Sequence, residues 1–272
     1  MMKLKMLAKT DVGIRRKHNE DFVGTTPSHG IAVLADGMGG YNAGEVASAM
    51  AVEIITNEIK AKVLDIPAAQ IDSDTGFTSE SILVRNAIRH ANDSIYDTAQ
   101  RKAGCAGMGT TVLVAVFYSD RITAAHVGDS RMYRQRDGEL THVTEDHSLI
   151  HEQVRRGLVT AQDARNSAIK NLVTRALGVG KGVDPDIVED TVFSGDLYLM
   201  CSDGLTDVVS DEIIEQTLTR FGKDMNKAAD ELIRLANAAG GPDNISIILI
   251  EASKKADPVK KSGGFFSRML GK

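Results

Sequence analysis

Apolar and polar positions along the chain follow two periods, one typical of strands and one typical of helices. Short β-branched apolar runs predict strands, because such residues fit a pleated, buried surface. These runs occupy residues 31–35, 111–118, 122–127, 197–201 and 245–250. Longer stretches with apolar residues three and four apart predict amphipathic helices. These occupy residues 43–63, 79–102, 211–221 and 225–239, the last with Asp224 as its expected N-cap and Gly240 as its stop.

The order of these elements favours an α+β fold. The predicted helices stand singly or in adjacent pairs between groups of strands, whereas a doubly wound parallel sheet requires strict alternation of strand and helix. Residues 146–188 interrupt the pattern, because they are polar, rich in arginine and helical only in short pieces. We interpret this segment as a flap over a functional site, since irregular insertions in compact domains are often functional. An ordinary solvated excursion is the alternative.

Composition and charge exclude several classes of protein. With 42% hydrophobic and 25% charged residues among 272, the chain has the makeup of an ordinary globular protein that buries a large core. The net charge is −5, and residues 253–272 contain six basic residues against one aspartate, which leaves −10 for the remainder. An acidic body without tryptophan argues against a nucleic-acid-binding surface.

The same composition predicts location and domain boundaries. The two cysteines, Cys105 and Cys201, are too few for a disulfide framework or a zinc site, and they predict a reducing, cytoplasmic location. No run of 18 apolar residues occurs, so we expect neither a signal peptide nor a membrane span. We expect one domain over residues 1–252 and a basic, flexible tail over residues 253–272. The tail is either a short docking peptide, a weak contact with an anionic surface, or a disordered terminus.

Four aspartates lie at the ends of predicted strands, each beside glycine. Asp36 lies in AVLADGMGGYNAG, Asp129 in HVGDSR, Asp203 in LYLMCSDGLTD and Asp243 in GGPDNIS. Carboxylates beside exposed backbone carbonyls suit hard cations such as Mg²⁺ or Mn²⁺. A single Asp-Gly after a strand is more often a turn, but four are hard to attribute to turns. If these strand ends converge, the aspartates form a metal cluster; otherwise the recurrence is coincidence.

A fifth segment, RKHNED at residues 16–21, adds a guanidinium and two carboxylates in one short, extended stretch. The planar Arg16 fork can donate two hydrogen bonds to paired oxygens, which suits a phosphate. Without the aspartates, a solvated run of charge would explain this segment equally well.

Together these motifs resemble the ordered series found in bacterial PPM-type, or PP2C-like, protein phosphatases. The similarity extends from about residue 5 to residue 251. It rests on TDVGIRRKHNED (10–21), ADGMGGYNAG (35–44), GMGTT (107–111), HVGDSR (126–131), DHS (146–148), NLVTRALG (171–178), CSDGLTD (201–207) and GGPDNIS (240–246). The resemblance implies an αββα sandwich, in which two antiparallel sheets pack face to face between helices.

The resemblance also implies an activity. Members are metal-dependent serine/threonine protein phosphatases, in which a water that bridges two Mn²⁺ or Mg²⁺ ions attacks phosphoserine or phosphothreonine directly. The expected partners are phosphorylated proteins, among them a serine/threonine kinase of bacterial signalling and its substrates, and the enzyme is expected to be a monomer. Phosphate monoester hydrolysis is very slow in water, and two cations supply the charge neutralisation that it needs.

Site roles follow from the resemblance position by position. Asp36 would bridge both metals and the carbonyl of Gly37 would bind one of them. Asp203 and Asp243 would complete the other, and Asp129 with Asp203 would form a weaker third site. Arg16 would hold the substrate phosphate. Glu20, Asp21 and Asn244 would support the metal ligands without binding the ions directly, and the two carboxylates would act through bound waters.

Departures and rival classes limit this assignment. Many eukaryotic relatives have a histidine, proposed as the general acid, at the position of Met38. We therefore expect a metal-bound water to be the acid. The three nearby histidines, His18, His126 and His147, are expected to be structural. A cysteine phosphatase is excluded, since no arginine lies six positions after either cysteine. DPDIV at residues 184–188 matches a haloacid-type motif but follows a glycine-rich loop instead of a strand. The remaining alternative is a catalytically inactive scaffold of the same fold that binds phosphoproteins.

Overall fold

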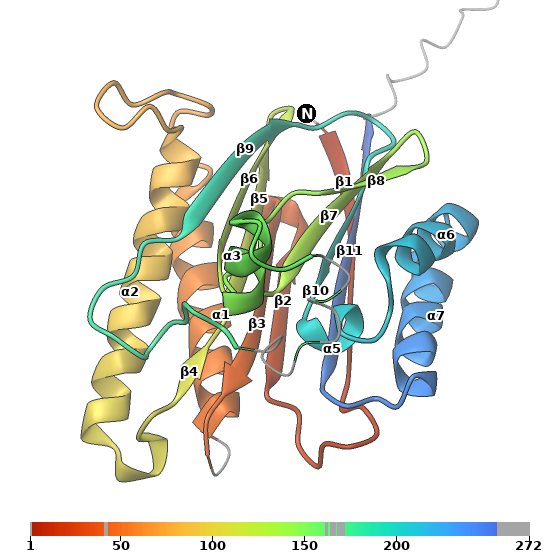
Figure 1. Cartoon of the computed structure of the whole chain (residues 1–272). Coiled ribbons are helices and arrows are strands. Elements are labelled where there is room, and N and C mark those ends of the chain that lie inside the picture. Colours follow the sequence, from red (N-terminus) through yellow and green to blue (C-terminus); the bar gives the residue numbers. More distant parts are fainter. Residues whose placement is uncertain (1, 41–42, 161–162, 164–166, 168–171, 255–272) are drawn as a thin grey trace, which may run out of the picture.

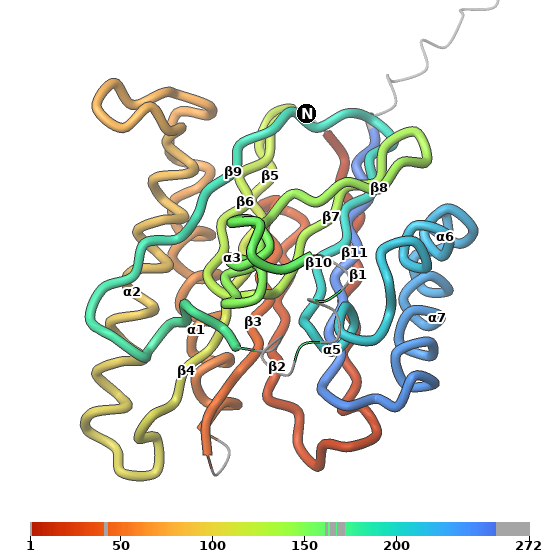
Figure 2. The backbone as a smooth tube through the Cα atoms, viewed as in Figure 1, coloured from red at the N-terminus to blue at the C-terminus, as the bar shows by residue number. Residues whose placement is uncertain are grey.

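Two antiparallel sheets lie face to face between two pairs of helices in the computed structural model, which describes residues 2–40, 43–160, 163, 167 and 172–254 (Figures 1 and 2). The first sheet has the order β1-β11-β10-β7-β8. Its strands are β1 (Met2–Asp11), β11 (Ile245–Lys254), β10 (Leu197–Cys201), β7 (Arg131–Arg136) and β8 (Glu139–His142). The second sheet has the order β2-β3-β5-β6-β9, and β4 also pairs with β3. Its strands are β2 (Asp21–Thr26), β3 (Ile31–Met38), β4 (Gly109–Thr110), β5 (Val112–Tyr118), β6 (Arg121–Val127) and β9 (Asp186–Thr191).

Helices cover the outer face of each sheet. The long helices α1 (Ala43–Lys62) and α2 (Ser79–Arg101) pack on the second sheet, and α6 (Asp211–Phe221) and α7 (Met225–Ala238) pack on the first (Figure 1). Short helical turns complete the chain: η1 (Pro27–His29), η2 (Ala103–Cys105), α3 (Leu149–Arg155) and α5 (Asp203–Thr206). The result is the αββα sandwich expected from the sequence. No described helix combines the length and apolarity needed to cross a membrane.

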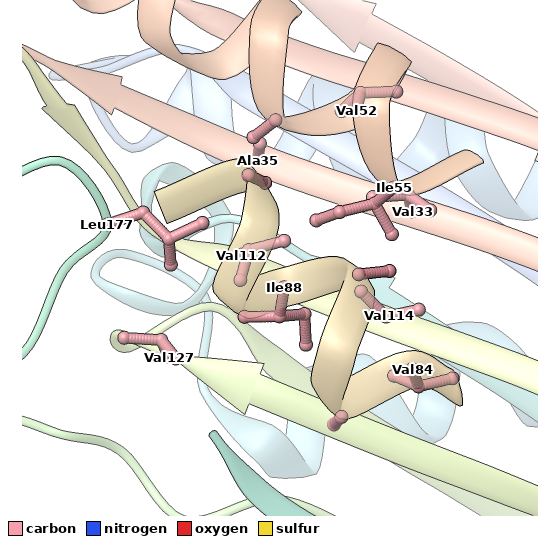
Figure 3. Packing of buried hydrophobic residues seen from close by; sticks show 14 of the residues in the cluster. Val33, Ala35, Val52, Ile55, Val84, Ile88, Val112, Val114, Val127 and Leu177 are labelled. Atoms are coloured by element: carbon pink, nitrogen blue, oxygen red, sulfur yellow. The ribbon is translucent and has the colours of Figure 1, made fainter. Parts of the chain in front are cut away.

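Three apolar layers follow from side chains that alternate along the central strands. On β3, Ile31, Val33 and Ala35 pack against α1 and α2, and Figure 3 shows Val33 and Ala35 among side chains of these helices. Their neighbours Ala32 and Leu34 pack between the two sheets. Because central strands are buried on both faces, they appear in the sequence as continuous apolar runs.

The central elements confirm the sequence prediction closely. Each predicted strand is present, and the four predicted helices end within two residues of their expected limits. Asp224 caps α7, because its side chain accepts a hydrogen bond from the Lys227 amide, 3.3 Å away.

The prediction missed β1, β2, β4, β7, β8 and β9. Four of them are the edges of the two sheets. Edge strands carry charged residues on an exposed face, as Lys3, Lys5 and Lys9 do on β1, so their apolar signal is weak.

Two expected boundaries differ from the structure. Residues 186–188, placed in the flap by the sequence, belong to β9 and pair with β6. The boundary expected after residue 252 falls inside β11, because Ser253 and Lys254 pair with Lys3 and Met2. The tail beyond Lys254 and the parts of the flap at residues 161–162, 164–166 and 168–171 lie outside the described residues.

Candidate metal centre

Five aspartates meet at one end of the sandwich, where strands from both sheets begin or end. Asp36 lies near the end of β3, and Asp21 begins β2 directly opposite it in the strand pairing. Asp203 follows β10 and Asp243 precedes β11. Asp129 follows β6, and the neighbouring Ser130 lies 3.0 Å from the hydroxyl of Thr111, whose amide binds the Asp36 carbonyl. The strand ends therefore converge, as the sequence analysis required for a metal cluster.

Burial and neighbouring negative charges both raise the pKa values of four of these carboxylates. Burial, and then neighbouring negative charges, raise the pKa of Asp36 well above its ordinary value. The neighbours responsible are Asp21, Asp203, Asp129 and Asp243. Burial, followed by the charges of Asp129 and Asp207, likewise raises the pKa of Asp203 well above the ordinary range.

Two further carboxyl groups of the cluster are buried and share this perturbation. Burial raises the pKa of Asp21 to about 6 despite hydrogen bonds from Ser246 and Ser202. Burial and the charge of Asp146 raise that of Asp129 to about 6. Like charges facing each other across a strand pair are destabilising, so this cluster needs a compensating positive charge.

Two carboxylate oxygens at this end of the sandwich are suited to a hard cation. Oδ1 of Asp21 and Oδ1 of Asp203 are buried and accept no hydrogen bond from any described residue. Among the described residues, no three or more His, Cys, Asp or Glu side chains form a ready-made ligand set. Hard cations take carbonyl and water oxygens as well as carboxylates, so a looser group of aspartates beside the Gly37 carbonyl is suited to Mg²⁺ or Mn²⁺.

Gly37 is held by close backbone contacts that leave no room for a side chain. A Cβ added to Gly37 would lie 2.2 Å from the carbonyl oxygen of Gly44, in the first turn of α1. The Gly37 amide donates to the Glu20 carbonyl over 3.1 Å, and the Thr110 hydroxyl donates to the Asp36 carbonyl over 2.8 Å. These contacts fix the β3 terminus against α1 and the loop before β2.

Arg16 reaches the same end from the loop before β2. Its Nη2 lies 2.6 Å from Oδ2 of Asp243. Burial lowers the pKa of Arg16, but the hydrogen bond and charge of Asp243, with Glu20 and Asp36 nearby, outweigh it and raise the pKa. The loop was expected to be extended, whereas it bends at Lys17 and His18.

Asn244 holds this loop. Its side-chain amide nitrogen donates to the carbonyls of Val12 and His18 over 2.8 and 2.9 Å, and its oxygen accepts from the Glu20 amide over 2.9 Å. Burial raises the pKa of Glu20, and the charge of Arg16 partly offsets this rise. The structure thus brings Arg16, Glu20 and Asn244 to the aspartates.

Two acidic residues near the cluster were missed by the sequence analysis. Asp207 perturbs both Asp129 and Asp203, and Asp146 perturbs Asp129. Asp207 follows Asp203 by four residues, which places both on one side of a helical turn, and this spacing was the available signal. Asp146 is bound by Arg131 through contacts of 2.7 to 3.0 Å, a pairing of two motifs that spacing alone does not reveal.

The buried histidines tie the start of the flap to β6. The rings of His126 and His147 stack with centroids 4.5 Å apart. His126 Nε2 lies 2.7 Å from the Glu145 carbonyl, and the Gly128 amide donates to His147 Nδ1 over 3.1 Å. Burial lowers the pKa of both rings, that of His147 to about 4 with help from the charges of His126 and Arg175. His18 is exposed, and its carbonyl accepts a hydrogen bond from Asn244.

Comparison with known proteins gives consistent matches. The family model described as Protein phosphatase 2C matches residues 14–240. The chain is 37% identical over 246 residues to "Serine/threonine phosphatase stp" of Listeria monocytogenes, which covers 89% of this chain and 94% of that protein. It is 35% identical over 248 residues to "Serine/threonine protein phosphatase PstP" of Mycobacterium tuberculosis, covering 91% of this chain and 45% of that protein.

Solved structures agree with these sequence matches. The crystal structure of the Mycobacterium tuberculosis serine/threonine phosphatase PstP/Ppp superposes with a TM-score of 0.82 at 34% identity, over 93% of this chain and all of that one. A structure of the PstP catalytic domain in complex with two manganese ions superposes with a TM-score of 0.81 at 33% identity, with the same coverage.

Proposed function

Because the chain belongs to the bacterial protein phosphatase 2C family and is a serine/threonine protein phosphatase, we propose that it acts at the aspartate cluster between the two sheets. The observation that carries this proposal is the convergence of four carboxylates around Asp36, whose pKa is raised by burial and then by their charges. Such a buried cluster needs either a compensating positive charge or the protonation of some of its carboxyl groups. The family is metal-dependent, and a solved relative holds two manganese ions.

We propose that two Mn²⁺ or Mg²⁺ ions occupy this cluster. Asp36 would hold both ions, the Gly37 carbonyl would bind one of them, and Asp203 and Asp243 would complete the other. Asp129 with Asp203 would hold a weaker third ion, and Asp207 and Asp146 add negative charge there. When bound, the cations would activate a water and neutralise phosphoryl charge.

The protein's own groups would orient the substrate. Arg16 is half exposed and carries a fixed positive charge beside Asp243, so its fork can turn to a phosphate at the edge of the cluster. Asn244 keeps the Arg16 loop on the Asp243 turn through the three hydrogen bonds described above. Glu20 and Asp21 would support the metal ligands without binding the ions directly.

The substrates are phosphoproteins. We propose that they include those of a bacterial serine/threonine kinase and the kinase itself, that the enzyme is a monomer, and that residues 146–185 act as a flap. The flap rests on the domain through Arg131–Asp146 and the stacked histidines, next to Asp129. Both cysteines are free and buried, which supports a reducing, cytoplasmic location.

Hydrolysis of a phosphothreonine peptide tests the site assignment. We expect turnover with Mn²⁺, none in EDTA, and none with Asp36→Asn in Mn²⁺. Asp97→Asn is the matched control, since Asp97 is exposed on α2 and pairs only with Arg101 among the contacts described. Full activity of Asp36→Asn would overturn the assigned cluster. Binding of the phosphopeptide without turnover under any condition would favour the scaffold.

A further inference from the structure

A second, apolar site lies at the opposite end of the sandwich. A cavity of about 230 Å³ opens between the start of β1, the end of α1 and the β5–β6 turn. Its apolar lining includes Met2, Leu4, Val63, Ile66, Phe117 and Val192. An apolar cavity of roughly 150 Å³ is enough to hold a benzene molecule, so this one has room for an aromatic side chain.

Two charged residues of this lining, Glu80 and Arg121, already have partners within the fold. The carboxylate of Glu80 is buried and accepts hydrogen bonds from the Ala69 amide at 3.0 and 3.1 Å. Arg121 pairs with Glu189 over 3.5 Å, while its buried Nε donates to no described atom. The chemistry of the cavity therefore fits an apolar group on a peptide, whose backbone carbonyl could accept from Arg121.

We propose that the cavity is occupied by the chain's own C-terminal segment, through Phe265 or Phe266. β11 ends at Lys254, and Lys254 pairs with Met2, which lines the cavity. Neighbouring strands lie about 5 Å apart, so the segment leaves the fold next to the cavity. Figure 1 shows β11 ending at the same edge at which β1 begins.

The length of the connection suits this occupant. Phe265 follows Lys254 by eleven residues, a stretch that spans at most about 40 Å when extended and about 20 Å as a flexible coil. Such a tether produces an effective concentration on the order of millimolar. A segment that binds only weakly as a free peptide would therefore occupy the site when tethered.

The apolar residues of the segment match the apolar lining of the cavity. Gly263 and Gly264 precede two phenylalanines, and Met269 and Leu270 follow at a spacing of four from them. Lysines and an arginine flank these apolar residues, and exposed Asp65 and Asp120 lie next in the chain to lining residues. Lys3 and Lys62 also neighbour lining residues, so the rim carries both signs and the match rests on the apolar side chains.

The site is separate from the aspartate cluster. β3 begins just after the lining residue Gly30 and carries Asp36 near its other end. β6 begins at the lining residue Arg121 and leads to Asp129. The docked segment therefore lies a full strand length away from the cluster and does not compete with the substrate for it.

Tryptophan fluorescence of the full chain tests the proposal, because the natural chain contains no tryptophan. Phe265→Trp and Phe266→Trp, made separately, each introduce a single reporter. We expect a blue-shifted emission and weak quenching by acrylamide for at least one of them in a monomer verified by sedimentation. Fully solvated emission in both variants overturns the proposal.

A second substitution links the signal to the cavity. Leu64 lies in the lining and is 68% exposed, so Leu64→Glu places a charge at the rim without disturbing the core. We expect it to abolish the blue shift, whereas Leu158→Glu, at a leucine that is 70% exposed outside the lining, retains it. A blue shift that survives Leu64→Glu refutes the assigned site. A shift seen only in a dimer, or only with phosphatidylglycerol vesicles, assigns the segment to a second copy or to a membrane instead.

Discussion

Replacing Asp36 by asparagine should have opposite effects on thermal stability in the absence and the presence of divalent cations. Without cations, the substitution removes one negative charge from the cluster and keeps the shape of the side chain. Burial, and then the charges of four neighbouring aspartates, raise the pKa of Asp36 well above its ordinary value, so its charged form is unfavourable in the fold. A buried polar group that lacks a compensating partner costs about 1 to 3 kcal/mol, and more when it is charged.

In EDTA we therefore expect Asp36→Asn to raise the free energy of unfolding by about 1 to 3 kcal/mol. For a domain of this size, each kcal/mol changes Tm by about 2 to 4 °C. With Mn²⁺ the order reverses. Each ion present at a hundred times its Kd stabilises the folded state by about 2.7 kcal/mol, so two ions contribute roughly 5 kcal/mol to the natural protein. The variant, without its proposed bridging ligand, should gain half of this or less.

Differential scanning fluorimetry at pH 7 measures both effects, with EDTA and then with increasing Mn²⁺. Asp97→Asn serves again as the control and should leave both Tm values within a degree or so of the natural protein, as exposed substitutions usually do. A lower Tm for Asp36→Asn in EDTA would refute the repulsion argument. An undiminished gain from Mn²⁺ would refute the ligand assignment.

Three further predictions concern pH, the substrate clamp and the β3 turn. In EDTA, urea denaturation should show a free energy of unfolding that falls as the pH rises from about 4 through 6. The reason is that the folded pKa values of Asp21 and Asp129 lie near 6, above their unfolded values. A rise in the free energy of unfolding over this window would contradict the prediction. Arg16→Ala should raise the KM for a phosphothreonine peptide about tenfold, since a charge-assisted hydrogen bond contributes about 1.5 to 3 kcal/mol; an unchanged KM contradicts the clamp. Gly37→Ala should cost about 1 to 3 kcal/mol of stability in the same denaturation assay, because its Cβ would lie 2.2 Å from a backbone oxygen. Gly40→Ala, with nothing within 4 Å of its Cβ, is the control, and equal losses for both would contradict the argument.

The sequence predicted the central strands and helices because these residues are buried on a regular period. β5 and β10 are buried along their whole length, so their apolar runs stand out. β8 and β9 have no fully buried residue and their register is set by the strands beside them. Local pattern cannot reveal such strands, since tertiary pairing places them.

The same distinction applies to the aspartate cluster. A carboxylate at a strand end is visible in the sequence, and Asp36, Asp129, Asp203 and Asp243 were found in this way. Asp146 contributes through tertiary proximity and its ion pair with Arg131, fifteen residues earlier, which no local rule predicts. Arg16 was identified because a guanidinium suits a phosphate. Its contact with Asp243 joins residues from opposite ends of the chain, so no local pattern predicts it.

The alternation along β3 also constrains how this protein can diverge. Asp36 continues the series of Ala32 and Leu34, which face the opposite sheet, because side chains along a strand alternate with a period of two. Inserting or deleting one residue between positions 31 and 36 would exchange both apolar faces and turn the Asp36 carboxylate toward the helices. Descendants that keep the fold but lose the activity should therefore arise by replacement at Asp36, while a change of length in β3 would remove fold and activity together.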